Sequence, residues 1–418
     1  MNFLEDISNY IRSGESRDEN LGLEIEHFII NDEGVQMGFH EISNLIDQVG
    51  RSLGAEIIYM DSYPVGYYTG EYSTSLEPAC QFEISINPYS DIETIENIYK
   101  EFRDIWDPIF FERGYHFETK GNLPIVETGV ITPDDIPLSP KKRYKYMDAY
   151  FKRSGRYGKY MMRASASTQV SIDYSSEDDM IRKLRILEKI SPILMILMEN
   201  KVDEDSTLPG NEEKKHLFRI QEWDDLDPER TGFVPYSLDN DFGYDKIAEV
   251  IYHTPLILLT DNGETVNVGH QSAEELVKNS IIYTDDLEEK RKKSLIEHFM
   301  SMGFFHFRVK KYIEVRVADS VPVNKALGYI ALLKGLVYSD ENLKLLEDEL
   351  SFVDDLDQIQ QSVEAIEEDG FDAVIYGGRT ADEWADHLIE LAHNALTDSD
   401  REYLENVRAF WSYSKQAS

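Results

Sequence analysis

Acidic and amide side chains alternate with apolar ones in the stretch Ser75–Ile86, which reads SLEPACQFEISI. Successive side chains on a β-strand point to opposite faces of a sheet, so residues two positions apart share a face. A strand here would present Glu77, Gln81 and Glu83 on one face and apolar side chains on the other. Pro78 cannot donate to a strand ladder, so the alternation is most secure for Gln81 and Glu83.

Three further stretches have the same alternation of polar and apolar residues. Their polar members are Glu24 and Glu26 in Leu21–Phe28, Gln169, Ser171 and Asp173 in Ser167–Tyr174, and Glu314 and Arg316 in Tyr312–Asp319. If the four strands share a sheet, five glutamates gather on one face and repel each other unless cations lie between them. Oxygen-rich sites of this kind suit magnesium, which keeps waters and shares its coordination with phosphates.

An ordinary sheet face in contact with water explains the alternation equally simply. Solvated strand faces, however, usually mix threonine and lysine with acids, and these positions hardly do so. The residue selection therefore favours a magnesium site on this face, and the solvated face stays the alternative.

Three arginines are candidates for binding anionic groups. Arg219 and Arg230 flank an acidic, tryptophan-bearing turn, and Arg316 shares a strand face with Glu314. A guanidinium group suits carboxylates and phosphates because its donors form a fixed fork. Ion pairing with neighbouring acids is an equally good explanation for Arg219 or Arg230 taken alone.

The composition limits the possible partners of the chain. Its 418 residues include 80 acids against 42 lysines and arginines, a net charge of −38, which repels nucleic acid and anionic membranes. An anionic substrate must therefore be met by local arginines or metal ions. The single cysteine, Cys80, excludes an intramolecular disulfide and a multi-cysteine zinc site. Without a signal-peptide pattern or a long apolar run, we expect a cytoplasmic protein; the oligomeric state is not predicted.

The elements that position these residues are predicted from their periodicity. Helices are expected over Glu41–Leu53, Asp91–Trp106, Lys141–Arg153 and Ser176–Met198, and from Asn324 onward, with a charged loop over Lys201–Lys215. The basic helix is expected to have an ordinary solvated face. Without a flexible linker, the chain is expected to form one unit over 1–418, with a sheet core over 22–322 and a helical region over 323–418.

Five blocks of the chain resemble, in the same order, motifs of the glutamate–cysteine ligase family in its plant and proteobacterial branch. They are LEPACQFEIS, DIPLSPKKRYKYM (Asp135–Met147), QVSIDYSSEDDMIRK (Gln169–Lys183), RTGFVP (Arg230–Pro235) and YIEVRVAD. The likeness extends roughly from Gly22 to Pro322. By contrast, the chain has no P-loop, no dinucleotide-binding fingerprint and no serine nucleophile elbow.

The resemblance implies an α+β fold with a glutamine-synthetase-like, curved and mostly antiparallel sheet that forms a funnel backed by helices. It also implies a reaction in which ATP phosphorylates the γ-carboxylate of glutamate and the amine of cysteine displaces the phosphate. The implied magnesium ligands are Glu24, Glu26, Glu77, Glu83 and Glu314; Gln81, Gln169 and Ser171 would help to bind cofactors, and Arg219, Arg230 and Arg316 would be catalytic.

Three departures from the family motifs concern the acceptor substrate. Ala79–Cys80 replaces a Gly-Gly pair, Ser171 replaces an asparagine, and Ile25 replaces a histidine between the first two glutamates. Pocket shape can change while the activation chemistry stays the same, so a γ-glutamyl ligase for another amine stays open. A non-enzymatic protein that binds divalent cations is the third reading, but it has no use for three arginines.

Two residues are expected to lie away from the polar face. On an alternating strand, Cys80 would lie on the same face as the apolar residues of its stretch. His27, next to Glu26, would lie on the face opposite to that of Glu26. We therefore expect a buried, slowly reacting thiol and a structural histidine.

Overall fold

The structure is a computed structural model that describes residues 3–282 and 287–417. Within these residues the main sheet has nine strands in the order β10-β11-β7-β1-β5-β4-β3-β2, with β6 pairing with the end of β1, and the paired strands are antiparallel. The strands are β1 Leu21–Asn31, β2 Glu56–Met60, β3 Tyr63–Tyr68, β4 Tyr72–Leu76, β5 Phe82–Tyr89, β6 Tyr115–Glu118, β7 Ser167–Ile172, β10 Phe307–Val309 and β11 Ile313–Asp319. The predicted α+β class, with a large antiparallel sheet backed by helices, is confirmed.

The four stretches with alternating residues do lie side by side, because β11, β7, β1 and β5 are neighbours in the sheet. The prediction of one continuous strand over Ser75–Ile86 is wrong, however. The chain turns back between β4 and β5, with Cys80 N bonded to Glu77 O (3.0 Å) and Glu77 N to Gln81 O (2.9 Å). Pro78 cannot continue a strand ladder, and the register then places Ser75 opposite Glu83.

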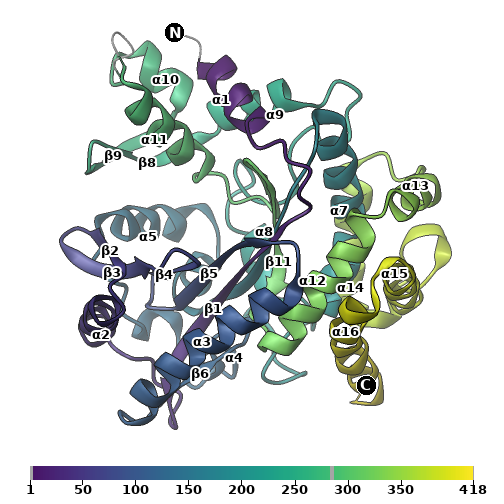
Figure 1. Ribbon diagram of the computed structural model, residues 1–418, viewed down its shortest axis with the longest axis horizontal. Coiled ribbons are helices and arrows are strands. Elements are labelled where there is room, and N and C mark those ends of the chain that lie inside the picture. Colours follow the sequence, from purple (N-terminus) through teal and green to yellow (C-terminus); the bar gives the residue numbers. More distant parts are fainter. Residues whose placement is uncertain (1–2, 283–286, 418) are drawn as a thin grey trace.

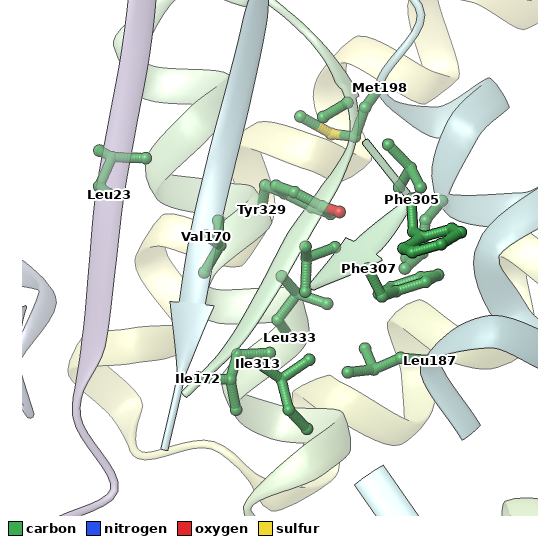
Figure 2. Packing of buried hydrophobic residues seen from close by; sticks show 14 of the residues in the cluster. Leu23, Val170, Ile172, Leu187, Met198, Phe305, Phe307, Ile313, Tyr329 and Leu333 are labelled. Carbon is green, nitrogen blue, oxygen red and sulfur yellow. The ribbon is translucent and has the colours of Figure 1, made fainter. Parts of the chain in front are cut away.

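Helices cover the apolar face of the sheet. The backing helices are α3 (Ile92–Phe111), α7 (Glu177–Leu197) and α12 (Val323–Val337), and Figure 1 shows α3 and α12 running beside β1. Figure 2 shows the resulting core, in which side chains of β1, β7 and β11 meet those of α7 and α12; among them are Leu23, Val170, Ile172, Ile313, Leu187, Tyr329 and Leu333. Burial of this apolar face fixes which side chains point the other way.

Three helices and a separate lobe lie beyond the polar face. The helices are α5 (Lys142–Ser154), α6 (Gly158–Ala164) and α8 (Phe218–Asp224). The lobe, at the upper left of Figure 1, contains α1 (Phe3–Arg12), α9 (Tyr244–His253), the hairpin β8–β9 (Pro255–Asp261 and Glu264–Ser272), α10 (Ala273–Lys278) and α11 (Glu289–Met300). α5 contacts the hairpin, so the lobe is joined to the helices beside the sheet.

The remaining elements are mostly helical and lie at the periphery. They are α2 (Phe39–Ser52), α4 (Pro124–Glu127), the 3₁₀ turns η1 (Pro133–Asp135), η2 (Gly370–Asp372) and η3 (Tyr376–Gly378), and the C-terminal helices α13 (Asp340–Glu349), α14 (Leu356–Asp369), α15 (Ala381–Ala395) and α16 (Asp398–Ala417). The five predicted helical regions are confirmed, and the described strands end at Asp319. The division into one unit with the bounds given above stays a prediction.

No helix in the described ranges combines the length and the apolar character needed to cross a membrane.

The packing of α3 gives a matched pair of stability predictions. Phe102 is fully buried against the rings of Phe82 and Phe117, whereas Phe111, on the same helix, is 82% exposed. Phe102→Ala should lower the free energy of unfolding by about 3–5 kcal/mol, because it leaves a cavity in the core. Phe111→Ala should change it by less than about 0.5 kcal/mol. Urea unfolding followed by circular dichroism measures both, and similar losses for the two variants would contradict the packing described here.

Candidate active site

The register of the central strands brings the predicted carboxylates together. Glu24 lies opposite Gln169 on β7, and Glu26 lies opposite Glu83 on β5. These side chains face a cavity of about 270 Å³. The predicted site residues that line it are Glu24, Glu26, Glu77, Gln81, Glu83, Gln169, Glu314 and Arg316. Eight of the eleven predicted residues are therefore gathered at one place, which makes the solvated-face alternative the weaker one.

Glu77 and Glu83 are held near each other by one hydroxyl group. The Ser75 Oγ atom lies 3.3 Å from Glu77 Oε1 and 3.1 Å from Glu83 Oε1, and Ser85 Oγ is also 3.1 Å from Glu83 Oε1. Although Glu77 lies in the turn and not on a strand, its side chain still lines the cavity.

For three of these carboxylates the ionised form is unfavourable. Burial, followed by the charges of Glu24 and Glu77, raises the pKa of Glu83 well above its ordinary value. Burial and the charge of Glu77 raise the pKa of Glu26 to about 7, and burial and Glu314 raise the pKa of Glu24. Each shift has the same physical cause, which is like charge concentrated away from water. A cation placed among these groups would relieve this repulsion and favour their ionised forms.

Glu314 differs from the other acids because protein cations already surround it. Burial opposes its ionisation, but Arg308, Lys310 and Arg316 together hold its pKa well below the ordinary value. Arg308 Nε bonds to Glu314 Oε2, Lys310 Nζ lies 2.9 Å from Oε1, and Arg316 Nη1 lies 3.4 Å from Oε2. The charge of Glu314 is therefore already balanced by these three cations, and its expected role as a magnesium ligand stays a prediction.

Gln169 connects a carboxylate to a guanidinium group across two strands. Its amide nitrogen donates to Glu26 Oε1 (3.1 Å), and its amide oxygen accepts from Arg316 Nη1 (2.5 Å). The second oxygen of Glu26 accepts from the backbone nitrogen of Ser167 (2.7 Å). Arg316 is thereby fixed at the edge of the carboxylate cluster with its charge facing the cavity.

The wall opposite the sheet comes partly from the basic helix α5. Arg143, Tyr144 and Met147 line the cavity, so the expectation of an ordinary solvated face for this segment is wrong. Lys141, just before α5, is buried and donates to Leu76 O (2.5 Å); burial lowers its pKa to about 8. The spacing of Tyr144 and Met147, three residues apart, is the sequence signal that one face of this helix is buried.

Arg308 and Lys310 were also missed from the sequence. Both line the cavity beside Glu314. They are two residues apart in the short stretch FRVK, and the alternation with Phe307 and Val309 could have revealed them.

Three predicted residues do not line the cavity. Ser171 lies opposite Gly22 and Glu314 in the sheet register, beyond the cluster. Arg219 is nearly buried behind Arg316 and donates to Arg316 O (3.3 Å). Arg230 is fully buried, with its guanidinium bonded to Asp227 Oδ2, Pro255 O and Tyr150 Oη. Arg230 thus ties α5 to the start of β8, and its expected catalytic role stays a prediction.

Gln81, Cys80 and His27 serve the scaffold. Gln81 accepts from Ala79 N (2.9 Å) and donates to Ser165 O (2.8 Å), so its amide holds the turn although it lines the cavity. Cys80 is buried, and burial raises the pKa of its thiol to about 12. The His27 ring lies 3.0 Å from Phe82 O and 2.9 Å from Tyr99 Oη, and burial lowers its pKa to about 3. The predicted burial of Cys80 and His27 is confirmed.

The carboxylate cluster fits an open magnesium site better than a closed one. In the part of the chain that the structure describes, no three histidine, cysteine or acidic side chains are placed so that they could hold a metal ion together. Magnesium needs only one or two carboxylates when phosphates and waters complete its octahedron. Glu24, Glu26, Glu77 and Glu83 offer such carboxylates, and a positive charge there would favour the ionised forms of the three whose pKa is raised.

Comparison with known proteins shows the family of the chain. The model of glutamate-cysteine ligase family 2 matches residues 20–392. The chain belongs to this family. It is 28% identical over 351 residues to the chloroplastic glutamate–cysteine ligase of Brassica juncea, covering 82% of this chain and 65% of that protein, and 27% identical to the Arabidopsis thaliana enzyme with 82% and 64% coverage. The chain thus spans less than two thirds of the length of these relatives.

A solved structure shares the fold. The glutamate–cysteine ligase of Francisella tularensis, crystallised in complex with AMP, aligns with a TM-score of 0.50 and 14% identity over 95% of this chain and 82% of that one.

The buried carboxylates generate a prediction about pH and magnesium. The pKa of Glu26 is about 7 against an ordinary value of 4.5, so between these values the folded protein holds a proton that the unfolded chain has released. The stability of the metal-free protein should therefore fall as the pH rises from 4.5 to about 7. Magnesium, which favours the ionised carboxylates, should offset this loss. Thermal unfolding across this pH range, with and without magnesium, measures both effects.

Two glutamine variants separate the cluster from ordinary buried acids. Glu26→Gln should flatten the pH dependence and weaken the stabilisation by magnesium. Glu188, in α7, is equally buried with a pKa of about 8, but it does not line the cavity. Glu188→Gln should flatten the pH dependence while leaving the magnesium effect intact. An undiminished magnesium effect in Glu26→Gln would exclude Glu26 from the metal site.

Proposed function

We propose that this protein is an ATP-dependent ligase that joins the γ-carboxylate of glutamate to the amine of cysteine. The observation that carries the proposal is the buried carboxylate cluster, short of positive charge, beside a guanidinium group held by Gln169. Membership of the family and the ligase names of its relatives support the same activity, and the AMP in the Francisella tularensis complex supports nucleotide use. The cytoplasmic location stays a prediction.

The proposed reaction has two steps. An oxygen of the glutamate γ-carboxylate attacks the terminal phosphorus of ATP, and the bond from that phosphorus to ADP breaks. The amine of cysteine, after losing a proton, attacks the acyl carbon of the resulting γ-glutamyl phosphate, and the carbon–oxygen bond to phosphate breaks. Both steps depend on positioning and charge neutralisation more than on a protein nucleophile.

We assign roles from the position of each side chain. Glu24, Glu26, Glu77 and Glu83 would hold magnesium, which when bound neutralises the phosphates of ATP and aligns them for transfer. Arg316 would stabilise charge on the transferring phosphoryl group, because Gln169 and Glu314 fix its guanidinium toward the cavity.

Three further side chains complete the proposed site. Arg143 reaches the cavity from the opposite wall, and its buried Nε atom has no hydrogen-bond partner among the described residues. It is therefore available to bind a substrate carboxylate. Met147 and Trp223 give the cavity an apolar surface that would exclude water from the acyl phosphate.

A direct assay tests the proposal. The protein is incubated with ATP, magnesium, glutamate and one of a panel of amines, while ADP release is followed and the products are identified by mass. We expect glutamate- and cysteine-dependent ADP release with formation of γ-glutamylcysteine. Release with another amine alone would establish a different γ-glutamyl ligase. Magnesium binding without any ADP release would favour the non-enzymatic reading.

Arg316→Lys distinguishes phosphoryl stabilisation from substrate binding. The variant keeps the charge but loses the planar fork that bonds to Gln169, so kcat should fall about 10- to 100-fold while the KM for glutamate changes less than about threefold. Arg51→Lys is the matched control, because Arg51 is a surface residue paired with Asp47, and it should leave both constants unchanged. A rise in the KM for glutamate alone would show that Arg316 binds a substrate carboxylate instead.

A further inference from the structure

A second, much smaller cavity lies directly behind the wall of the candidate active site. Its volume is about 10 Å³, and its lining residues are Arg219, Ile220, Trp223, Phe304, Phe305, His306 and Arg316. Trp223, Phe304 and Arg316 line the large cavity as well. The two cavities are therefore separated by the thickness of these three side chains.

Four buried polar atoms, three on residues that line the small cavity and one on Asp224 beside His306, have no hydrogen-bond partner among the described residues. They are Arg219 Nε, Trp223 Nε1, Asp224 Oδ1 and His306 Nε2. Arg219 and His306 are 3% and 4% exposed, so bulk water does not reach them. Burying a polar group without a hydrogen-bond partner is costly, so four of them together need an explanation.

His306 and Asp224 are close without satisfying each other. His306 Nε2 lies 3.1 Å from Asp224 Oδ1, but a proton on this nitrogen would not point at that oxygen. The other oxygen of Asp224 accepts from Gln360 of α14 (3.2 Å), so Asp224 is held in place from behind. A water molecule beside the pair, rather than between the two atoms, can donate to both where a direct bond does not form.

The hydrogen-bonding capacities of the four atoms match one water molecule. Arg219 Nε and Trp223 Nε1 are donors only, Asp224 Oδ1 is an acceptor, and His306 Nε2 accepts in the neutral tautomer protonated on Nδ1. One water can accept two hydrogen bonds and donate two. The cavity volume is close to the minimum of about 10–15 Å³ that a single buried water requires.

We propose that one ordered water occupies this cavity, bonded to Arg219, Trp223, Asp224 and His306, and that Asp224 and His306 thereby act as positioning residues for Arg219. The Arg219 side chain has one direct hydrogen bond in the described structure, to Arg316 O (3.3 Å), and its guanidinium carbon lies 5.9 Å from the centre of the Trp223 ring. The water supplies the restraint at Nε that these contacts lack. The catalytic consequence, a fixed positive charge behind Arg316, rests on the proposed function.

The water itself can be detected without any assay of activity. In the folded wild-type protein, the Trp223 indole proton, identified by its loss in Trp223→Phe, should show a nuclear Overhauser contact with a long-lived water. Trp384 is the matched control, because its indole donates directly to Tyr376 O (3.1 Å) and should show no such contact. Absence of a water contact at Trp223 would overturn the proposal.

A pair of substitutions at His306 tests the positioning role. Glutamine keeps an acceptor oxygen near the position of Nε2, whereas leucine has no acceptor. Crystal structures should show the water retained in His306→Gln and absent in His306→Leu. At a temperature where both variants are fully folded, kcat should be about ten-fold lower in His306→Leu than in His306→Gln.

The measurements at His306 and at the Trp223 indole test different parts of the proposal, and each can fail without the other. Equal kcat values in the two His306 variants would overturn the positioning role. If the wild-type protein itself releases no ADP, the proposed function fails, while the indole measurement still decides whether the water is present.

Discussion

The concentration of buried negative charge on one sheet face is the constraint on which the rest of the site depends. Glu24, Glu26 and Glu83 are brought together by the antiparallel register, and burial together with the charges of neighbouring glutamates raises all three pKa values. A fold keeps such a cluster only if packing elsewhere is strong enough to fix the register. The apolar face supplies that packing, because a one-residue slip would expose its side chains and bury the acids in the core.

The acids on this sheet face fall into two groups that differ in the charges around them. Glu314 is balanced by Arg308, Lys310 and Arg316, so it anchors the cationic end of the site. Glu24, Glu26 and Glu83, on β1 and β5, form no direct ion pair within the described residues, and their pKa values stay raised. Gln169 lies at the boundary, with its nitrogen toward Glu26 and its oxygen toward Arg316. A site with a negative side and a positive side, joined by one amide, suits a metal-bound polyphosphate substrate.

Much of this arrangement could be predicted from the sequence, because a period of two directly encodes which side chains share a sheet face. Glu24, Glu26 and Glu83 were placed correctly on that basis. The turn at Pro78 broke the period locally, although Glu77 still reached the cavity. Arg230 could not be placed, because its partners Tyr150 and Pro255 come from other elements and only the tertiary fold brings them together. The orientation of α5 was missed for the same reason.

The structure gives one explanation for the three departures from the family motifs. Cys80 adopts a φ of 68°, a conformation that glycine takes without strain, so the glycine pair of the family motif suits this turn. Its side chain, like that of Ile25, is buried on the apolar side, and Ser171 lies beyond the cavity. None of these residues lines the cavity in which the substrates would react. The departures therefore alter the scaffold and give no physical reason for an acceptor other than cysteine.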